Sequence, residues 1–304
     1  MRTIQLGTSG LQVPVIAVGC MRMHGLEPAD AERFVQTAME EGAIFFDHAD
    51  IYGGDGVCEK IFAEAAHMTA SVREKMILQS KCGIRPSLYD FSKEHILASV
   101  DGILKRLRTD YLDVLLLHRP DALMEPEEVA EAFDTRQNSG KVRHFGVSNQ
   151  NPGQIQLLQK HLKQPIVANQ LQFSVTRANM ITQGFHVNTA NDGGINRDGS
   201  VLDFCRLNDI TIQPWSPFRS SFGVVIGNDK LPELNAKLDE LAEKYGVSST
   251  AVMIAWMLRH PANMQPIIGT MNVQRLKDCV RATDIHISRE EWYEIYLSAG
   301  NKLP

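Results

Sequence analysis

The chain of 304 residues lacks several features that mark other classes of protein. No apolar run approaches the roughly 20 residues that a membrane-spanning helix needs, and residues 1–7 lack the apolar core of a signal peptide. The net charge of −5 provides no basic excess, which argues against nucleic acid as the main partner. We therefore expect a cytoplasmic protein with neither a membrane nor a nucleic acid as its partner.

Cysteine is scarce, and none of the five cysteines belongs to a C-x-x-C pair. Scattered cysteines in odd number are typical of reduced thiols in the cytoplasm. Paired metal ligands are also missing, since His48, His118 and His144 form no H-x-H motif. Residues 191–199 are rich in Asn, Asp and Gly, but their acidic spacing does not fit a calcium loop. The sequence thus predicts no metal site and disfavours a zinc hydrolase.

Short apolar segments alternate with helical patterns along most of the chain. Eight segments rich in apolar and β-branched residues predict strands, at residues 15–18, 44–46, 76–78, 114–117, 145–147, 166–168, 211–212 and 266–268. Their near-continuous apolar character is typical of strands that are buried on both faces. Helical patterns fill most gaps, at residues 29–41, 93–107, 127–139, 154–161, 201–207, 250–259 and 273–282. This alternation predicts an α/β fold.

Eight strands alternating with helices predict a (β/α)8 TIM barrel, in a single domain over residues 1–304. A doubly wound sheet is the alternative architecture. Residues 4–12 predict a short β-hairpin, with Ser9-Gly10 at its turn, before the barrel begins.

Four further segments are additions to the eight-fold pattern. Residues 231–245 and 289–299 predict extra helices near the C-terminus. Residues 172–200 and 218–230 predict long loops, which usually carry function at the active face of a barrel.

Four polar residues stand at or just beyond the ends of three different predicted strands. Asp47 and Tyr52 follow the second strand, Lys81 follows the third, and His118 ends the fourth. Because parallel barrel strands open on one face at their C-terminal ends, these residues are expected to converge. Taken singly, each has an ordinary structural explanation: a helix cap, a surface ring, a solvated strand end and a core histidine. Together they indicate a site that donates protons.

The chemistry of such a site follows from the side chains. A tyrosine hydroxyl can protonate a carbonyl oxygen, but its pKa of about 10 makes it a weak acid at neutral pH. Lowering that pKa by about two units takes roughly 2.7 kcal/mol. One cation about 4 Å away supplies on the order of 4 kcal/mol at an effective dielectric near 20. We therefore expect Lys81 to lower the pKa of Tyr52, Asp47 to hold Lys81, and His118 to polarise the carbonyl.

Longer motifs resemble those of the aldo-keto reductase superfamily over essentially the whole chain. They are Leu6-Gly7-Thr8-Ser9-Gly10-Leu11-x-Val13, Gly19-Cys20-Met21-Arg22, Asp47-x-Ala-x-x-Tyr52-Gly53, Lys81, Leu117-His118-Arg119-Pro120 and Gly140-Lys141-Val142-Arg143-x-x-Gly146-Val147-Ser148-Asn149. By its length and by the residues of these motifs, the chain is similar to bacterial oxidoreductases of that superfamily. The resemblance implies a barrel that reduces aldehydes or ketones with a nicotinamide cofactor. It also implies that Tyr52 is the general acid, that Lys81 and Asp47 tune it, and that His118 orients the carbonyl.

The same resemblance implies a cofactor site. Its expected residues are Met21, Arg22, Asp47, Ser148, Asn149, Gln170, Trp215, Ser216, Pro217, Phe218, Gly269, Thr270, Asn272 and Arg275. Ser148, Asn149 and Gln170 would hold the nicotinamide carboxamide, and Trp215 would stack on its ring. Residues 216–218 would face the pyrophosphate, and residues 268–275 would bind the adenosine 2′-phosphate. No G-x-G-x-x-G occurs, which removes the Rossmann fingerprint.

Two positions depart from the family pattern. Gly269 stands where many members have Lys, and Cys279 where many have Asn facing the adenine. Because Arg275 remains, we expect NADP(H) as the cofactor, with NAD(H) possible. The partner would be a small-molecule carbonyl substrate, while the sequence makes no prediction of oligomeric state. The alternative function is a regulatory subunit that binds nicotinamide nucleotide with little turnover.

Overall fold

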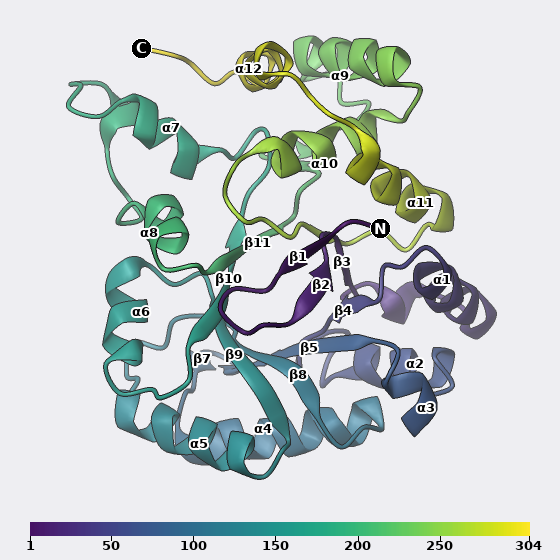
Figure 1. The fold of residues 1–304 in the computed structure, drawn as a ribbon, viewed down its shortest axis with the longest axis vertical. Coiled ribbons are helices and arrows are strands. Elements are labelled where there is room, and N and C mark those ends of the chain that lie inside the picture. The colour runs from purple at the N-terminus through teal and green to yellow at the C-terminus, as the bar shows by residue number, and fades with distance from the viewer.

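The computed structural model of the protein describes all residues 1–304. Eight parallel strands form one sheet in chain order: β3 (Ala17–Gly19), β4 (Phe45–Asp47), β5 (Ile77–Cys82), β8 (Leu112–Leu117), β9 (Val142–Ser148), β10 (Ile166–Gln172), β11 (Thr211–Trp215) and β14 (Ile267–Ile268). The last strand, β14, pairs with the first, β3, and a parallel bridge joins Ile212 of β11 to Met264 before β14. The sheet therefore closes, so the barrel prediction is confirmed and the doubly wound alternative is wrong (Figure 1).

Helices surround this ring of strands (Figure 1). They are α1 (Pro28–Glu40), α2 (Val57–Ala65), α3 (Ala70–Arg73), α4 (Lys93–Leu107), α5 (Pro126–Asn138), α6 (Pro152–Gln159), α7 (Asn179–Phe185), α8 (Val201–Leu207), α9 (Pro232–Tyr245), α10 (Ser249–Arg259), α11 (Val273–Arg281) and α12 (Arg289–Ser298). The extra helices predicted near the C-terminus are α9 and α12. None of the helices combines the length and the apolar composition that crossing a membrane requires.

Helix α4 illustrates how local sequence sets an element. Its start is capped by the Ser92 side chain, which accepts a hydrogen bond from the His95 backbone N–H at 3.3 Å. Its buried residues lie at the predicted helical spacing: Ile96, Val100, Ile103, Leu104 and Leu107. It ends at Arg108, whose φ of 54° lies in the left-handed region.

The predicted N-terminal hairpin is present as antiparallel strands β1 (Thr3–Gln5) and β2 (Gln12–Pro14). Its connection is longer than a two-residue turn at Ser9-Gly10, since the Leu6 backbone N–H donates to the Leu11 carbonyl at 2.9 Å. Gly7 in this connection has a φ of +51°, and a Cβ there would lie 2.3 Å from the Val167 carbonyl oxygen. Only glycine permits this approach, which brings the hairpin against the inner barrel.

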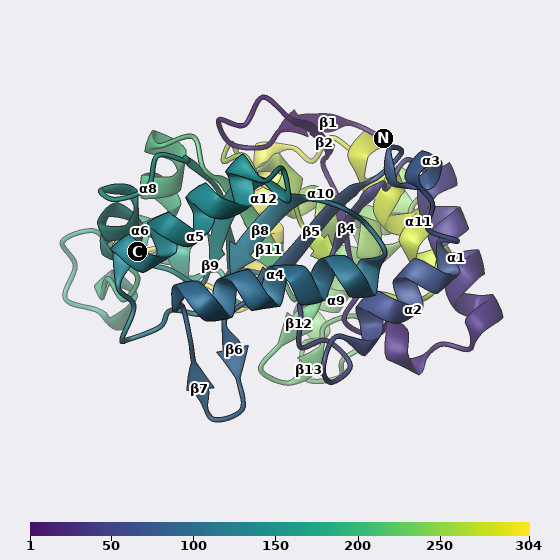
Figure 2. The ribbon, with the colours of Figure 1, turned by 90° about the horizontal axis from the view of Figure 1, so that it is seen from below.

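Four segments contain structure that the sequence did not predict. Helix α2 lies between β4 and β5, and residues 172–200 include α7 and a 3-10 turn, Asp192–Gly194. Two small hairpins extend loops after β5 and β11: β6 (Ile84–Arg85) with β7 (Leu88–Tyr89), and β12 (Arg219–Ser220) with β13 (Gly223–Val224). Figure 2 shows both on the side of the barrel opposite the β1–β2 hairpin. They therefore stand at the C-terminal ends of the barrel strands.

Candidate functional site

A cavity of about 1210 Å³ opens at the C-terminal ends of the barrel strands. Its wall contains most of the predicted site residues: Met21, Arg22, Asp47, Tyr52, His118, Ser148, Asn149, Gln170, Trp215, Ser216, Pro217, Phe218, Gly269, Thr270 and Arg275. Two predicted residues, Lys81 and Asn272, do not line it. The structure thus brings together residues from all parts of the chain in one open site.

Backbone geometry explains why the four candidate catalytic residues meet. Asp47 ends β4, and its register partner on β5 is Gln79, two residues before Lys81. The His118 backbone N–H donates to the Cys82 carbonyl at 2.9 Å, which holds the end of β8 against β5. A tight turn after β4, in which the Tyr52 N–H donates to the Ala49 carbonyl at 3.0 Å, returns Tyr52 to the strand ends.

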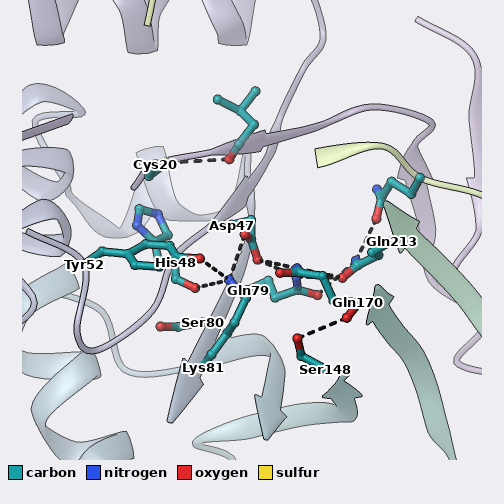
Figure 3. Close-up of polar contacts among 12 residues, drawn as sticks. Cys20, Asp47, His48, Tyr52, Gln79, Ser80, Lys81, Ser148, Gln170 and Gln213 are labelled. Carbon is teal, nitrogen blue, oxygen red and sulfur yellow. Dashed lines mark hydrogen bonds and ion pairs between the residues drawn. The ribbon is translucent and has the colours of Figure 1, made fainter. Parts of the chain in front are cut away.

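Lys81 lies behind the cavity wall with none of its side chain exposed. Its Nζ donates to Asp47 Oδ2 at 2.8 Å, to the His48 carbonyl at 2.7 Å and to Tyr52 Oη at 3.1 Å (Figure 3). These three bonds use all three hydrogens of the ammonium group. Lys81 therefore faces Tyr52 and not the open cavity.

The pKa of Tyr52 differs from the expectation. Burial raises the pKa of its hydroxyl above the usual value, and the Lys81 ammonium offsets only part of that increase. The expected net lowering is therefore wrong for this structure, because desolvation of the phenolate outweighs one nearby cation. Tyr52 holds its proton firmly at neutral pH.

Lys81 and His118 are shifted in opposite directions. Burial alone would lower the pKa of Lys81, but the Asp47 carboxylate and the Tyr52 oxygen reverse this effect, and the net shift is upward. Burial, with help from the Lys81 and Arg119 charges, lowers the pKa of His118 to about 2. The His118 ring is neutral, stands edge-on to Tyr52 with centroids 6.0 Å apart, and keeps its Nδ1 buried without a partner.

Sequence reasoning missed a chain of buried glutamines beneath Asp47. Gln79 Nε2 donates to Asp47 Oδ1 at 2.6 Å and to Gln213 Oε1 at 2.9 Å. Gln213 Nε2 donates in turn to Gln265 Oε1 at 2.9 Å, and Gln265 Nε2 donates to the Pro14 carbonyl at 2.6 Å. One signal of this chain is present in the sequence: Gln79, Gln213 and Gln265 each lie in or beside an apolar strand, namely β5, β11 and β14. Figure 3 shows Gln79, Gln170 and Gln213 grouped beside Asp47.

One end of the cavity presents a fixed aromatic face with amide groups beside it. Trp215 Nε1 donates to Asn149 Oδ1 at 3.1 Å, and Asn149 Nδ2 donates to Ser148 Oγ at 2.7 Å. Ser148 Oγ donates to the Gln170 carbonyl at 3.1 Å, while Gln170 Nε2 donates to Asp47 Oδ1 at 3.1 Å. These bonds hold the indole in one orientation, as a stacking surface requires.

The other end is cationic. Arg22 Nη1 donates to the Gly269 carbonyl at 2.6 Å, and Arg275 stands in the first turn of α11. Asn272 is the cap of that helix, because its Oδ1 accepts from the Arg275 N–H at 2.9 Å. Its side chain is thus committed to the helix end, away from the cavity wall. Cys279 is fully buried in the core and cannot face a nucleotide base.

The charges of the wall fit an anionic nucleotide. Arg22, Arg219 and Arg275 line the cavity, and its only carboxylate is Asp47, which pairs with Lys81. A helix N-terminus and arginines together form a site for phosphate, and the fixed indole suits a flat ring. No group of three or more His, Cys, Asp or Glu side chains is placed to hold a metal ion.

Comparison with known proteins gives four findings. A family model described as "Aldo/keto reductase family" matches residues 15–296. The chain is 35% identical over 318 residues to the uncharacterized oxidoreductase YcsN of Bacillus subtilis, with 100% of both chains covered. It is 34% identical over 309 residues to a 6-dehydroglucose reductase of Novosphingobium aromaticivorans, covering 99% of this chain and 96% of that protein. The crystal structure of the thermostable aldo-keto reductase Tm1743 with the inhibitor epalrestat covers 98% of this chain and 100% of its own, with a TM-score of 0.79 and 26% identity.

Proposed function

This chain belongs to the aldo/keto reductase family, and on that premise we propose that it reduces an aldehyde or ketone to the alcohol with NADPH. The observation that carries the proposal is the contact of Tyr52 Oη with the fully buried Lys81 ammonium, 3.1 Å away, at the wall of the cavity. The five cysteines are free and buried, which suits a protein of the reducing cytoplasm.

Tyr52 is the proposed general acid. The nicotinamide cofactor, when bound, supplies the hydride that reaches the carbonyl carbon. The Tyr52 hydroxyl gives its proton to the carbonyl oxygen, which becomes the alcohol, and the phenolate left behind is stabilised by Lys81. Tyr52 then regains a proton from water. Its raised pKa keeps the proton in place until the oxygen gains negative charge, and Lys81 reduces the cost of the phenolate at that moment.

His118 and Asp47 support this step in different ways. The neutral His118 ring can donate a hydrogen bond to the carbonyl oxygen, which orients the substrate without a net charge. Asp47 balances the charge of Lys81 inside the barrel, where an unpaired ammonium would be costly. The four candidate catalytic residues therefore provide one proton donor, one hydrogen-bond donor and a neutralised ion pair.

Two groups of residues are proposed to hold the cofactor. Ser148, Asn149, Gln170 and Trp215 would bind the nicotinamide end. Met21, Arg22, Ser216, Pro217, Phe218, Gly269, Thr270 and Arg275 would bind the phosphates and adenosine. The preference for NADPH over NADH is supported by Arg22 and Arg275, because a guanidinium can bind a 2′-phosphate through two hydrogen bonds.

The test is the loss of NADPH absorbance with a small carbonyl panel, such as 4-nitrobenzaldehyde and methylglyoxal, in the wild type and in Tyr52→Phe. We expect turnover to fall by roughly two or more orders of magnitude in the variant, since a general acid is lost. NADPH binding, followed by fluorescence, should remain. Tyr293→Phe on α12 is the matched control and should keep full activity. Equal turnover in Tyr52→Phe would remove Tyr52 from the mechanism, and binding without any turnover would favour a nucleotide-binding regulatory subunit.

A further inference from the structure

Arg119 stands beside the proposed reacting centre. It follows His118 directly after β8, is half-buried, and lines the same cavity as Tyr52 and His118. Its guanidinium carbon lies 5.6 Å from the centroid of the Trp215 ring. A permanent cation is therefore present at the end of the cavity where the carbonyl is proposed to bind.

This cation has no anionic partner in the structure. By contrast, two buried arginines elsewhere in the fold are paired with acids, Arg73 with Asp113 at 2.6 Å and Arg136 with Asp101 at 2.8 Å. The Arg119 guanidinium forms no ion pair and no hydrogen bond, and it lies near the Trp215 ring. The nearest acid in sequence, Asp121, accepts backbone hydrogen bonds from Phe91 and Leu123 instead.

The other cations in the cavity wall or behind it have different surroundings. Lys81 is neutralised by Asp47, and Arg22 donates to the Gly269 carbonyl at the cationic end. Arg275 stands at the start of α11 at that same end. Arg219 also lines the cavity without an anionic partner, but like Arg22 and Arg275 it is exposed to solvent. Arg119 is thus the one half-buried cation of the cavity wall that lacks an anionic partner, and its neighbours on that wall include the apolar Ile51 and Ile84.

We propose that Arg119 binds the carboxylate of the substrate, so that the preferred substrates are aldehydes or ketones that carry a carboxylate. This inference rests on the proposed function and extends it to a substrate class. A guanidinium forms two parallel hydrogen bonds with a carboxylate, and partial burial strengthens them relative to water. A single half-buried guanidinium provides one such two-point contact, which one carboxylate group fills.

The experiment compares a matched pair of substrates, 4-carboxybenzaldehyde and its neutral methyl ester, methyl 4-formylbenzoate. The measured quantity is the ratio of their kcat/KM values in the wild type, Arg119→Gln and Arg119→Lys, with NADPH saturating. We expect the wild type to favour the carboxylate, and Arg119→Gln to reduce the ratio about 10- to 100-fold. Arg119→Lys should restore part of the ratio, because it keeps the charge and loses the two-point geometry. Arg33→Gln, an exposed arginine on α1, is the control and should leave the ratio unchanged.

Three results would overturn the proposal. The first is turnover of both substrates with a ratio that does not respond to Arg119→Gln, which leaves the reductase proposal intact. The second is a raised NADPH Kd in Arg119→Gln with an unchanged substrate ratio, which would assign Arg119 to the cofactor. The third is a greater preference for glyceraldehyde 3-phosphate over glyceraldehyde than for the carboxylate over its ester.

A binding measurement keeps the inference testable if no carbonyl is reduced. Calorimetric titration of the NADP+-loaded protein with 4-(hydroxymethyl)benzoate reports carboxylate binding without any turnover. Binding that weakens about tenfold or more in Arg119→Gln would support the carboxylate site even though the reductase proposal had failed. Equal binding by the wild type and the variant would overturn it.

Discussion

At the scale of single residues, the buried charge of Lys81 sets the requirements for its neighbours. Its ammonium is matched by Asp47 Oδ2, and Asp47 Oδ1 accepts hydrogen bonds from the amides of Gln79 and Gln170. Each carboxylate oxygen of Asp47 thus accepts at least one hydrogen bond, which fixes the position of the carboxylate. The proton donor Tyr52 depends on this arrangement through Lys81.

Gln79 is therefore expected to act as a positioning residue for Asp47. In Gln79→Leu, Asp47 Oδ1 loses one of two donors and Gln213 loses both bonds to Gln79. We expect kcat to fall about tenfold, since charge-assisted hydrogen bonds contribute about 1.5–3 kcal/mol, while the KM for NADPH changes little. The pH profile of kcat should also shift, because the Asp47–Lys81 pair is held less firmly. Steady-state kinetics across pH measures both effects.

Gln265→Leu is the matched control for this variant. Gln265 is as buried as Gln79 and belongs to the same glutamine chain, but it contacts Gln213 and the Pro14 carbonyl instead of Asp47. Both variants should lower the melting temperature by leaving buried amides unpaired. Only Gln79→Leu should change kcat and the pH profile. A similar loss of kcat in both variants would reduce the role of Gln79 to stability.

The contrast between these glutamines and the four candidate catalytic residues shows what a sequence can predict at this scale. Tyr52, Lys81 and His118 could be found because each stands at or beyond a predicted strand end, and barrel geometry places all strand ends on one face. Gln79 could not be found in this way, because its side chain is hydrogen-bonded to Gln213, which lies 134 residues away in the sequence. A polar residue inside an apolar strand gives no hint of its partner until the barrel has closed.

At the scale of elements, the same limit explains why helix α2 was missed. Its inward face carries Glu59, which is fully buried and accepts hydrogen bonds from Ser80 Oγ at 2.7 Å and Arg106 Nε at 2.7 Å. An acid on the buried face interrupts the apolar pattern that predicts a helix. The partners that make this burial possible lie on β5 and α4. By contrast, α4 has an uninterrupted apolar face and a serine cap, and it was predicted with its observed bounds.

Helix α11 carries the residue that we expect to set the preference between NADPH and NADH. Its capped N-terminus places Arg275 beside the cavity, where a 2′-phosphate is proposed to bind. In Arg275→Ala we expect the KM for NADPH to rise about 10- to 100-fold, since a charged hydrogen bond contributes about 1.5–3 kcal/mol. The KM for NADH should change little, because NADH lacks that phosphate. Steady-state kinetics with both cofactors and one carbonyl measures the ratio.

Arg281→Ala is the control on the same helix. Arg281 is exposed in the last turn of α11 and does not line the cavity. It should leave both KM values near those of the wild type. Parallel changes in the KM for NADPH and for NADH in Arg275→Ala would contradict a role in recognising the 2′-phosphate.

At the scale of the whole molecule, buried titratable groups make stability depend on pH in two opposing ways. Burial lowers the pKa of His48 to about 3 and that of His118 to about 2, so the folded chain keeps both neutral. The unfolded chain protonates them below pH of about 6.5, and stability is lost as the pH falls from there. Asp50 has the opposite effect, because burial and the charge of Glu59 raise its pKa to about 7. Its contribution is fully present below pH of about 4 and is lost as the pH rises through about 7.

Asp50→Asn separates the second effect from the first, because it leaves both histidines unchanged. The variant keeps a neutral side chain at every pH, whereas the wild type must bury a carboxylate above pH of about 7, with Oδ1 unpartnered. We expect the variant to exceed the wild type in free energy of unfolding by about 1–3 kcal/mol at pH of about 8, and the difference to vanish toward pH of about 4. Urea unfolding over that pH range measures the difference in free energy of unfolding.

Asp55→Asn, an exposed position in the same loop, should change stability by less than about 0.5 kcal/mol at every pH. A difference for Asp50→Asn that does not grow with pH would mean that Asp50 is charged in the fold throughout, with its compensation supplied by Arg106.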